Sequence, residues 1–144
     1  MAVESSKADF PHLCTVQTRW HDNDIYGHVN NVVYYSYFDS VVNRYLIEQG
    51  GLDIHNGQVV GFVVESQCNY LKPLAYPDAI TAGLRVGKLG NSSVRYELAL
   101  FNQQDQLCAQ GHFVHVFVDK ASNKPAPIPE LTRRALALLI PATP

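Results

Sequence analysis

The sequence predicts an α+β fold in which an antiparallel β-sheet wraps around one long central α-helix. Three observations support this prediction: one long segment with helical periodicity, five segments with strand composition, and short turn-rich links between consecutive strands. Consecutive strands joined by short links favour antiparallel pairing. A single helix that is apolar around most of its circumference must be enclosed by the sheet.

The long helix is predicted from Asn31 to Gln49. Its polar side chains recur three and four residues apart and form one narrow stripe: Ser36, Asp39, Ser40, Asn43 and Arg44. The remaining positions are almost all apolar or aromatic, which indicates a helix enclosed on most sides. Gly50 and Gly51 follow directly, and glycine commonly ends a helix because it adopts left-handed backbone angles.

Five segments rich in β-branched and aromatic residues are predicted as strands: 13–20, 59–70, 79–88, 93–101 and 107–118. Proline, glycine and asparagine residues lie between them and supply the turns. A polar tail of about residues 1–11 precedes these elements, and a short helix is expected at about 129–140. We therefore expect one domain that spans 1–144.

Composition excludes several classes of protein. At 144 residues with 47% hydrophobic side chains, the chain is long enough to bury a core and is not disordered. A formal net charge of −2, with scattered Lys and Arg, disfavours a nucleic-acid partner. No apolar leader and no apolar run of membrane-spanning length is present, so we expect a soluble, cytoplasmic protein without a membrane partner. Cys14, Cys68 and Cys108 lack C-x-x-C spacing, which favours reduced thiols over disulfides.

The stretch RWHDNDIYGHVNN, which ends at Asn31, crowds aspartates, histidines and asparagines directly before the long helix. Capping by Asn30 or Asn31 explains part of this pattern, and Asp22 or Asp24 would complement the positive helix end. One cap does not require so many polar side chains. We therefore interpret the stretch as a reaction site at a helix N-terminus.

Metal sites and a serine nucleophile fit the sequence poorly. Asp22, Asp24 and Gly27 resemble the opening of a calcium loop, but Tyr26 and Val33 stand where oxygen ligands are needed. Four histidines lack the paired spacing of a transition-metal site: His21, His28, His112 and His115. No G-x-S-x-G motif is present. We therefore expect neither a metal nor a redox cofactor.

A carboxylate beside a helix N-terminus suits acyl transfer from sulfur. The helix end presents unpaired N–H groups and a partial positive charge, which stabilise the oxyanion formed when a carbonyl is attacked. A carboxylate can activate water or attack directly, and a thioester is reactive enough for this weak nucleophile. Asp24 and Asp22 are the candidates in the motif. Glu65 is a third, although a buried, hydrogen-bonded strand glutamate is the simpler expectation for it.

The motif, followed by YYSYFDS, closely resembles the 4-hydroxybenzoyl-CoA thioesterase-like branch of the hotdog-fold acyl-CoA thioesterases. FVVESQCNYLKPLAYPD resembles the second strand of that family and its Pro turn, and AQGHFVHVFVD resembles its last long strand. The resemblance covers most of the chain from about Cys14 to Pro129. It implies the hotdog fold and hydrolysis of an acyl-CoA to a carboxylic acid and free CoA, without a separate cofactor.

The resemblance also implies residue roles. Asp24 would be the catalytic carboxylate, and the N–H group of Asn31 would be the oxyanion donor. His28 and Asn30 would shape the pocket and orient the thioester or water. Residues near the turn between the third and fourth strands would contact the CoA phosphates: Lys88, Ser92, Ser93 and Arg95. Family members form homodimers whose sheets join and hold acyl-CoA between subunits, and many pair again into tetramers.

Two other functions are compatible with the same fold. A non-catalytic acyl-CoA-binding module would lack the carboxylate that Asp24 supplies. A hotdog hydratase or dehydratase uses an Asp and a His with four residues between them, whereas three residues separate Asp24 from His28. Short, long and aromatic acyl groups all stay open, as does the choice between direct attack and activation of water.

Overall fold

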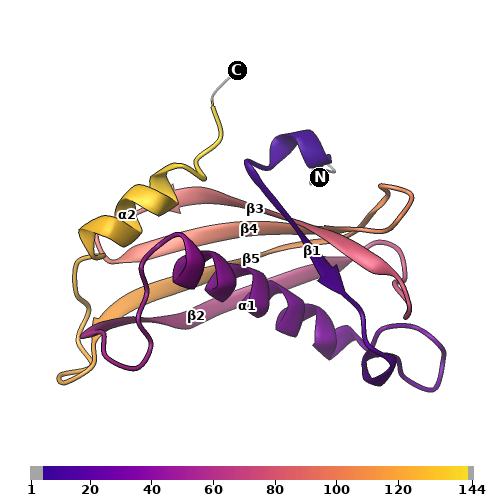
Figure 1. Cartoon of the computed structure of the whole chain (residues 1–144), viewed down its shortest axis with the longest axis horizontal. Helices are drawn as coiled ribbons and strands as arrows, with labels where there is room; N and C mark the ends of the chain where they lie inside the picture. The colour runs from indigo at the N-terminus through magenta and orange to yellow at the C-terminus, as the bar shows by residue number, and fades with distance from the viewer. Residues whose placement is uncertain (1–4, 143–144) are drawn as a thin grey trace.

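The computed structural model describes residues 5–142 (Figure 1). Five strands form one antiparallel sheet in the order β1-β3-β4-β5-β2. All five predicted strands are present, with these bounds: β1 His12–Gln17, β2 Val59–Tyr70, β3 Ala79–Leu89, β4 Ser93–Phe101 and β5 Leu107–Asp119. β1 is shorter than predicted, because Trp20–Asp22 form a 3-10 turn instead of continuing the strand.

Helix α1, Asn31–Glu48, lies across one face of this sheet (Figure 1). Its sheet-facing side chains are buried: Tyr34, Tyr37, Phe38, Val41, Val42, Tyr45 and Leu46. The opposite side is open, with Val32 67% and Ile47 48% exposed. The prediction of a helix enclosed on most sides is therefore wrong for the single chain, because one sheet covers only one face of a helix.

The second helix, α2, spans Glu130–Ala137 and packs near the end of β3. The hydroxyl of Tyr45 donates to the Ala135 carbonyl at 2.6 Å, and that of Thr132 donates to the Gly50 carbonyl at 2.7 Å. These bonds tie α2 to the last turns of α1. In the part of the chain that the structure describes, neither helix is long and apolar enough to cross a membrane.

The outer face of the sheet, which points away from α1, carries part of the N-terminal segment. Phe10 is buried on it and packs against Ala99 and over Gly83, two residues that lie on the neighbouring strands β4 and β3. A Cβ atom at Gly83 would lie 2.6 Å from the Phe10 ring, so this close approach requires glycine. Of the predicted polar tail, residues 1–4 lie outside the described residues.

Candidate active site

The loop that precedes α1 is a small closed hairpin. The N–H group of Asp24 donates to the His28 carbonyl at 2.9 Å, and Asn23 forms a β-bridge with Val29. Gly27 closes the tip with φ +84°, a left-handed angle that glycine adopts readily. The hairpin holds Asp24 at its base, close in sequence and space to the start of the helix.

At the N-terminus of α1, the Asn31 N–H group has no acceptor among the described residues. Asn30 is the N-cap, and its Oδ1 accepts from the Val32 N–H at 3.1 Å, while its carbonyl accepts from the Val33 N–H at 2.9 Å. Among residues 5–142, no group accepts a hydrogen bond from the Asn31 N–H. The Tyr70 hydroxyl donates to the Asn31 carbonyl at 3.0 Å and fixes this turn against β2. The Asn31 N–H is therefore available at the positive end of the helix.

The Asp24 carboxylate is held by one oxygen only. Its Oδ1 accepts from the Tyr26 N–H at 2.9 Å, and within the described residues its Oδ2 accepts no hydrogen bond. Asp24 lines an open cavity of about 570 Å³. The other lining residues are Trp20, His21, Asn23, Ile25 and Gly27. One carboxylate oxygen is thus oriented by the loop, and the other is available for chemistry.

Sequence reasoning missed the apolar rim of this cavity. Trp20 is 75% and Ile25 93% exposed, although both are large apolar side chains. The sequence could have predicted this rim, because one large apolar residue stands on each side of the D-x-D pair. Exposed apolar side chains that gather around a polar group often mark a binding site.

Asp22, the other candidate carboxylate in the motif, accepts hydrogen bonds on both of its oxygens. It is 1% exposed and accepts from the Tyr37 hydroxyl at 2.7 Å, the Arg19 backbone N–H at 2.9 Å and the Arg19 guanidinium at 3.1 Å. Burial raises the pKa of Asp22, but the hydrogen bonds from Tyr37 and Arg19 outweigh it and hold the pKa below its ordinary value. Asp22 therefore has a structural role in this chain and is not accessible to a substrate.

Glu65 does not lie where the sequence predicts. Its side chain is 58% exposed, and its Oε2 lies 2.6 Å from Nε2 of His112 on the outer face of the sheet. The expectation of a buried glutamate is wrong, because β2 is an edge strand whose outer face meets solvent. Within one chain the sheet separates Glu65 from the N-terminus of α1.

The remaining motif residues have distinct positions. His28 is exposed on the hairpin, and the Asn30 side chain serves as the helix cap. Tyr34, Tyr37 and Phe38 belong to the core, as expected for a helix that packs on a sheet. Within residues 5–142, no group of three or more His, Cys, Asp or Glu side chains could hold a metal ion.

A second cavity, of about 400 Å³, lies between α1 and the edge of the sheet. It starts at Tyr35, one helical turn after Asn31, and Tyr35 stacks on Phe113 with ring centroids 6.4 Å apart. The other lining residues are Ser36, Asp39, Val63 and Ser66. The polar stripe of the helix therefore lines an open cavity, which sequence reasoning did not anticipate.

The residues predicted to bind CoA lie far from Asp24 in the same chain. The site loop is tied to the start of β3, where Asn23 Oδ1 accepts from the Tyr76 N–H at 3.1 Å. Lys88 lies nine residues beyond Ala79, where β3 begins, which corresponds to about 30 Å along an extended strand. The turn with Ser92 and Ser93 is at that distant end of the sheet (Figure 1). One chain therefore does not bring the two predicted groups together.

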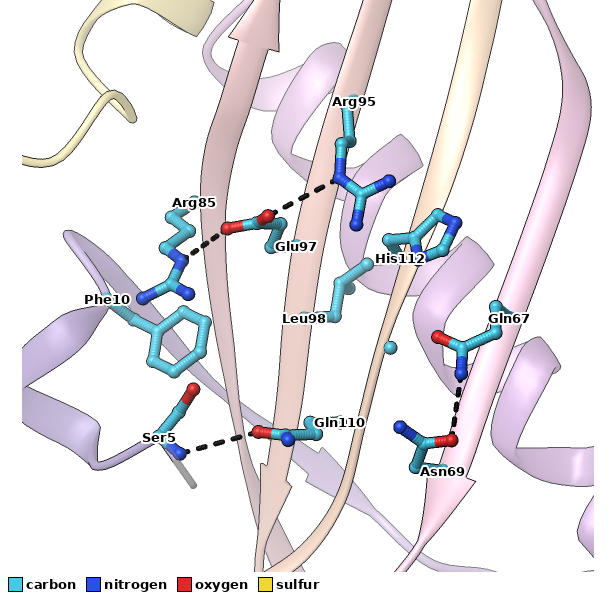
Figure 2. A pocket seen from close by; sticks show the side chains of 11 residues that line it. Ser5, Phe10, Gln67, Asn69, Arg85, Arg95, Glu97, Leu98, Gln110 and His112 are labelled. Atoms are coloured by element: carbon cyan, nitrogen blue, oxygen red, sulfur yellow. Dashed lines mark hydrogen bonds and ion pairs between the residues drawn. The ribbon is translucent and has the colours of Figure 1, made fainter. Parts of the chain in front are cut away.

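Arg95 belongs to a cavity of about 220 Å³ on the outer face (Figure 2). There Glu97 accepts from Arg85 at 2.7 Å and from Arg95 at 3.4 Å. Burial raises the pKa of Glu97, but the two guanidinium groups outweigh it and lower the pKa below the ordinary value. Two guanidinium groups share the one carboxylate of this cavity, and Arg95 faces away from α1.

Comparison with known proteins identifies the family. The family model of the thioesterase-like superfamily matches residues 18–136. The chain belongs to this superfamily. This thioesterase-like chain is 55% identical to the PA5185 protein from Pseudomonas aeruginosa strain PAO1, with a TM-score of 0.92 over 96% of this chain and 97% of that one.

The chain is also similar to two further proteins. A thioesterase from Thermus thermophilus, solved with coenzyme A and Zn, is 33% identical with a TM-score of 0.76, over 90% of this chain and 95% of that one. Protein YsmA of Bacillus subtilis strain 168 is 27% identical over 124 residues, 86% of this chain and 84% of its own. The resemblance to hotdog-fold thioesterases is confirmed.

Proposed function

We propose that the protein hydrolyses acyl-CoA thioesters to a carboxylic acid and free CoA. The observation that carries the proposal is the free Asn31 N–H at the start of α1, next to a loop in which Asp24 keeps one carboxylate oxygen unbonded within the described residues. Membership of the thioesterase-like superfamily and the coenzyme A bound to the Thermus relative support CoA as part of the substrate.

The chemistry needs an oxyanion donor and a carboxylate. The thioester oxygen accepts a hydrogen bond from the Asn31 N–H, which offsets the negative charge that develops on attack. Asp24 either attacks the carbonyl carbon to give a mixed anhydride, which water then hydrolyses, or removes a proton from an attacking water. Either route releases the CoA sulfur as a thiol and the acyl group as an acid. His28 lies in the loop and orients the thioester or water, and Asn30 caps the helix.

We also propose that the active unit is a homodimer joined through β2. This strand is an edge of the sheet and exposes Phe62, Val63 and Val64, which are 49%, 45% and 60% exposed. An exposed apolar edge strand is a template for pairing with another strand. Two copies of β2 paired antiparallel would continue the sheet from one subunit into the next.

Antiparallel pairing of β2 would also unite the two halves of the predicted site. The Tyr70 end of β2 contacts Asn31. The Val59 end lies near the β3–β4 turn, because Val59 pairs with Asp119 of β5 and Ser93 pairs with Val116, three residues earlier on the same strand. Pairing with a second copy reverses these ends, so the β3–β4 turn of one subunit approaches Asp24 of the other. The CoA-contact role of Lys88, Ser92, Ser93 and Arg95, and a further pairing into a tetramer, stay predictions.

The free thiols Cys14, Cys68 and Cys108 support a reducing compartment, so we propose a cytoplasmic location.

The test is release of free CoA from a panel of short, medium, long and aryl acyl-CoAs. We expect hydrolysis by the natural protein and a loss of about 100-fold or more in Asp24→Asn, because the carboxylate takes part in the reaction. The control is Asp105→Asn, which changes an exposed carboxylate in a turn whose φ of 62° asparagine tolerates. The acyl-CoA that is hydrolysed fastest identifies the preferred acyl group.

Two results would contradict the proposal. Full activity in Asp24→Asn would remove the carboxylate from the mechanism. Binding of acyl-CoA without release of CoA by the natural protein would favour a non-catalytic acyl-CoA-binding module.

A further inference from the structure

We propose that Tyr37 and Asp22 are positioning residues, which form a buried clamp that sets the place of Asp24 relative to the Asn31 N–H. The clamp ties the interior of α1 to the loop in front of it. The inference rests on the proposed hydrolysis and deepens it, because it names the residues that hold the two reacting groups in register.

The clamp itself is a hydrogen bond between the helix and the loop. Tyr37 extends from the buried side of α1, almost two turns after Asn31, and its hydroxyl donates to Asp22 Oδ2 at 2.7 Å. Both side chains are buried, with 5% of Tyr37 and 1% of Asp22 exposed. Arg19 completes the shell of donors around the carboxylate. Hydrogen bonds from Tyr37 and Arg19 offset the cost of burying this charged group and hold it in place.

From Asp22 the clamp reaches the oxyanion donor. The Asp22 carbonyl accepts from the Asn30 N–H at 2.9 Å, and the Asn30 side chain caps Val32 at 3.1 Å. The main chain of Asp22 therefore sets the position of the helix cap. The cap in turn leaves Asn31 as the first helical residue with an unpaired N–H group among those described.

From Asp22 the clamp also reaches the carboxylate. Asp24 is two residues further on, and the hairpin gives it little freedom, because its N–H donates to the His28 carbonyl at 2.9 Å. Asn23, between the two aspartates, is held by its bridge to Val29. A shift of Asp22 would therefore move Asp24 and the Asn31 N–H by different amounts. Such misplacement costs rate, because catalysis depends on the geometry of the reacting groups.

The same helix offers a matched control. Tyr45 lies eight residues after Tyr37 on the same buried side of α1, and its hydroxyl donates to the Ala135 carbonyl at 2.6 Å. Tyr37→Phe and Tyr45→Phe each remove one buried hydroxyl and one hydrogen bond while they keep the ring. Only the first hydrogen bond leads to the site loop.

The experiment compares these two variants in two measurements. The first is kcat and KM with the acyl-CoA that the panel identifies, and the second is hydrogen exchange of the amides of residues 20–31. We expect Tyr37→Phe to lower kcat about tenfold or more with KM within about twofold, and to speed exchange in the loop. Tyr45→Phe should lower the melting temperature but leave kcat and loop exchange unchanged. Asp22→Asn, which keeps the shape of the side chain, should change the same two quantities in the same direction.

The proposal is overturned if loop exchange in Tyr37→Phe equals that of the natural protein, or if both tyrosine variants lower kcat equally. Should the natural protein release no CoA, the proposed function fails, whereas the exchange measurement still decides whether the clamp holds the loop.

Discussion

The two sides of the sheet differ in how their polar side chains are hydrogen-bonded. On the outer face, polar and charged side chains pair with one another, and most of these pairs cross between strands. Glu97 accepts from Arg85 and Arg95, and Glu65 lies 2.6 Å from His112 (Figure 2 shows the Glu97 cluster). These pairs satisfy their members within a single chain.

The inner side, which carries α1 and its loop, pairs Asp22 with Arg19 and Tyr37 but leaves some other polar groups without a partner among the described residues. Asp24 keeps an oxygen without a hydrogen bond, and the Asn31 N–H has no acceptor within residues 5–142. Deeper in the core of the described chain, the Tyr96 hydroxyl and His115 Nδ1 are buried without partners. A self-paired cluster stabilises the fold, whereas unpaired groups at an open cavity are available to a ligand.

The largest expected effect comes from blocking the edge of the sheet. If the unpaired groups on the inner side need a second subunit, Val64→Lys should convert a dimer to a monomer and lower CoA release about 100-fold, because a charged edge strand resists pairing. Analytical ultracentrifugation and the CoA assay measure the two quantities. Leu138→Lys, which changes an apolar side chain that is 76% exposed on the distant C-terminal segment, is the control. A fully active monomer would contradict the two-subunit site.

A smaller effect is expected from the buried His115, which should make the stability of the fold depend on pH. Burial lowers the pKa of His115 from its ordinary value of 6.5 to about 4, although the Asp39 charge raises it in part. As the pH falls below 6.5, the unfolded chain therefore takes up this proton before the folded chain does. The contribution of His115 to the free energy of unfolding should therefore fall by about 3 kcal/mol between pH 6.5 and 4.

His115→Leu should remove that pH-dependent loss, whereas His112→Leu on the outer face of the same strand should keep it. Urea unfolding at a series of pH values measures the difference. An unchanged slope in His115→Leu would show that another group is responsible.

The smallest expected effect is the loss of stability when Glu97 on the outer face is changed. Glu97→Gln should lower the free energy of unfolding by about 1 kcal/mol at pH 7 and leave CoA release within about twofold. Because the two guanidinium groups hold the pKa of Glu97 below 4.5, its contribution is complete above that pH and is lost as the pH falls through the lowered pKa. The gap between variant and natural protein should therefore narrow toward pH 3.

Glu130→Gln, in an exposed pair with Arg134, is the matched control and should change stability less. Loss of CoA release in Glu97→Gln would break the comparison, because it would give the outer face a part in the reaction.

Local pattern predicted much of this molecule. Strand composition identified all five strands, and the periodicity after Asn31 placed α1 within one residue of its end at Glu48. These elements depend on the residues within them, so a single sequence is enough to find them. The motif before α1 also predicted a helix cap, and Asn30 supplies it.

The pairing partners could not be predicted in the same way. Nothing local to Asp22 indicates that its carboxylate is buried under Tyr37, or that Glu65 faces His112 across the strands. Both contacts join residues that lie well apart in the chain, 15 residues in the first pair and 47 in the second. Such contacts depend on strand order and on which face of the sheet each side chain occupies.

The sequence by itself determined the elements, their order along the chain, the family motif and the candidate carboxylates. The tertiary structure decided which of those carboxylates is free. It buries Asp22, turns Glu65 to the outer face and leaves Asp24 at an open cavity in the loop before α1. The physical reason is that periodicity encodes local conformation, whereas the access and the partners of a polar group are set by distant segments that pack around it.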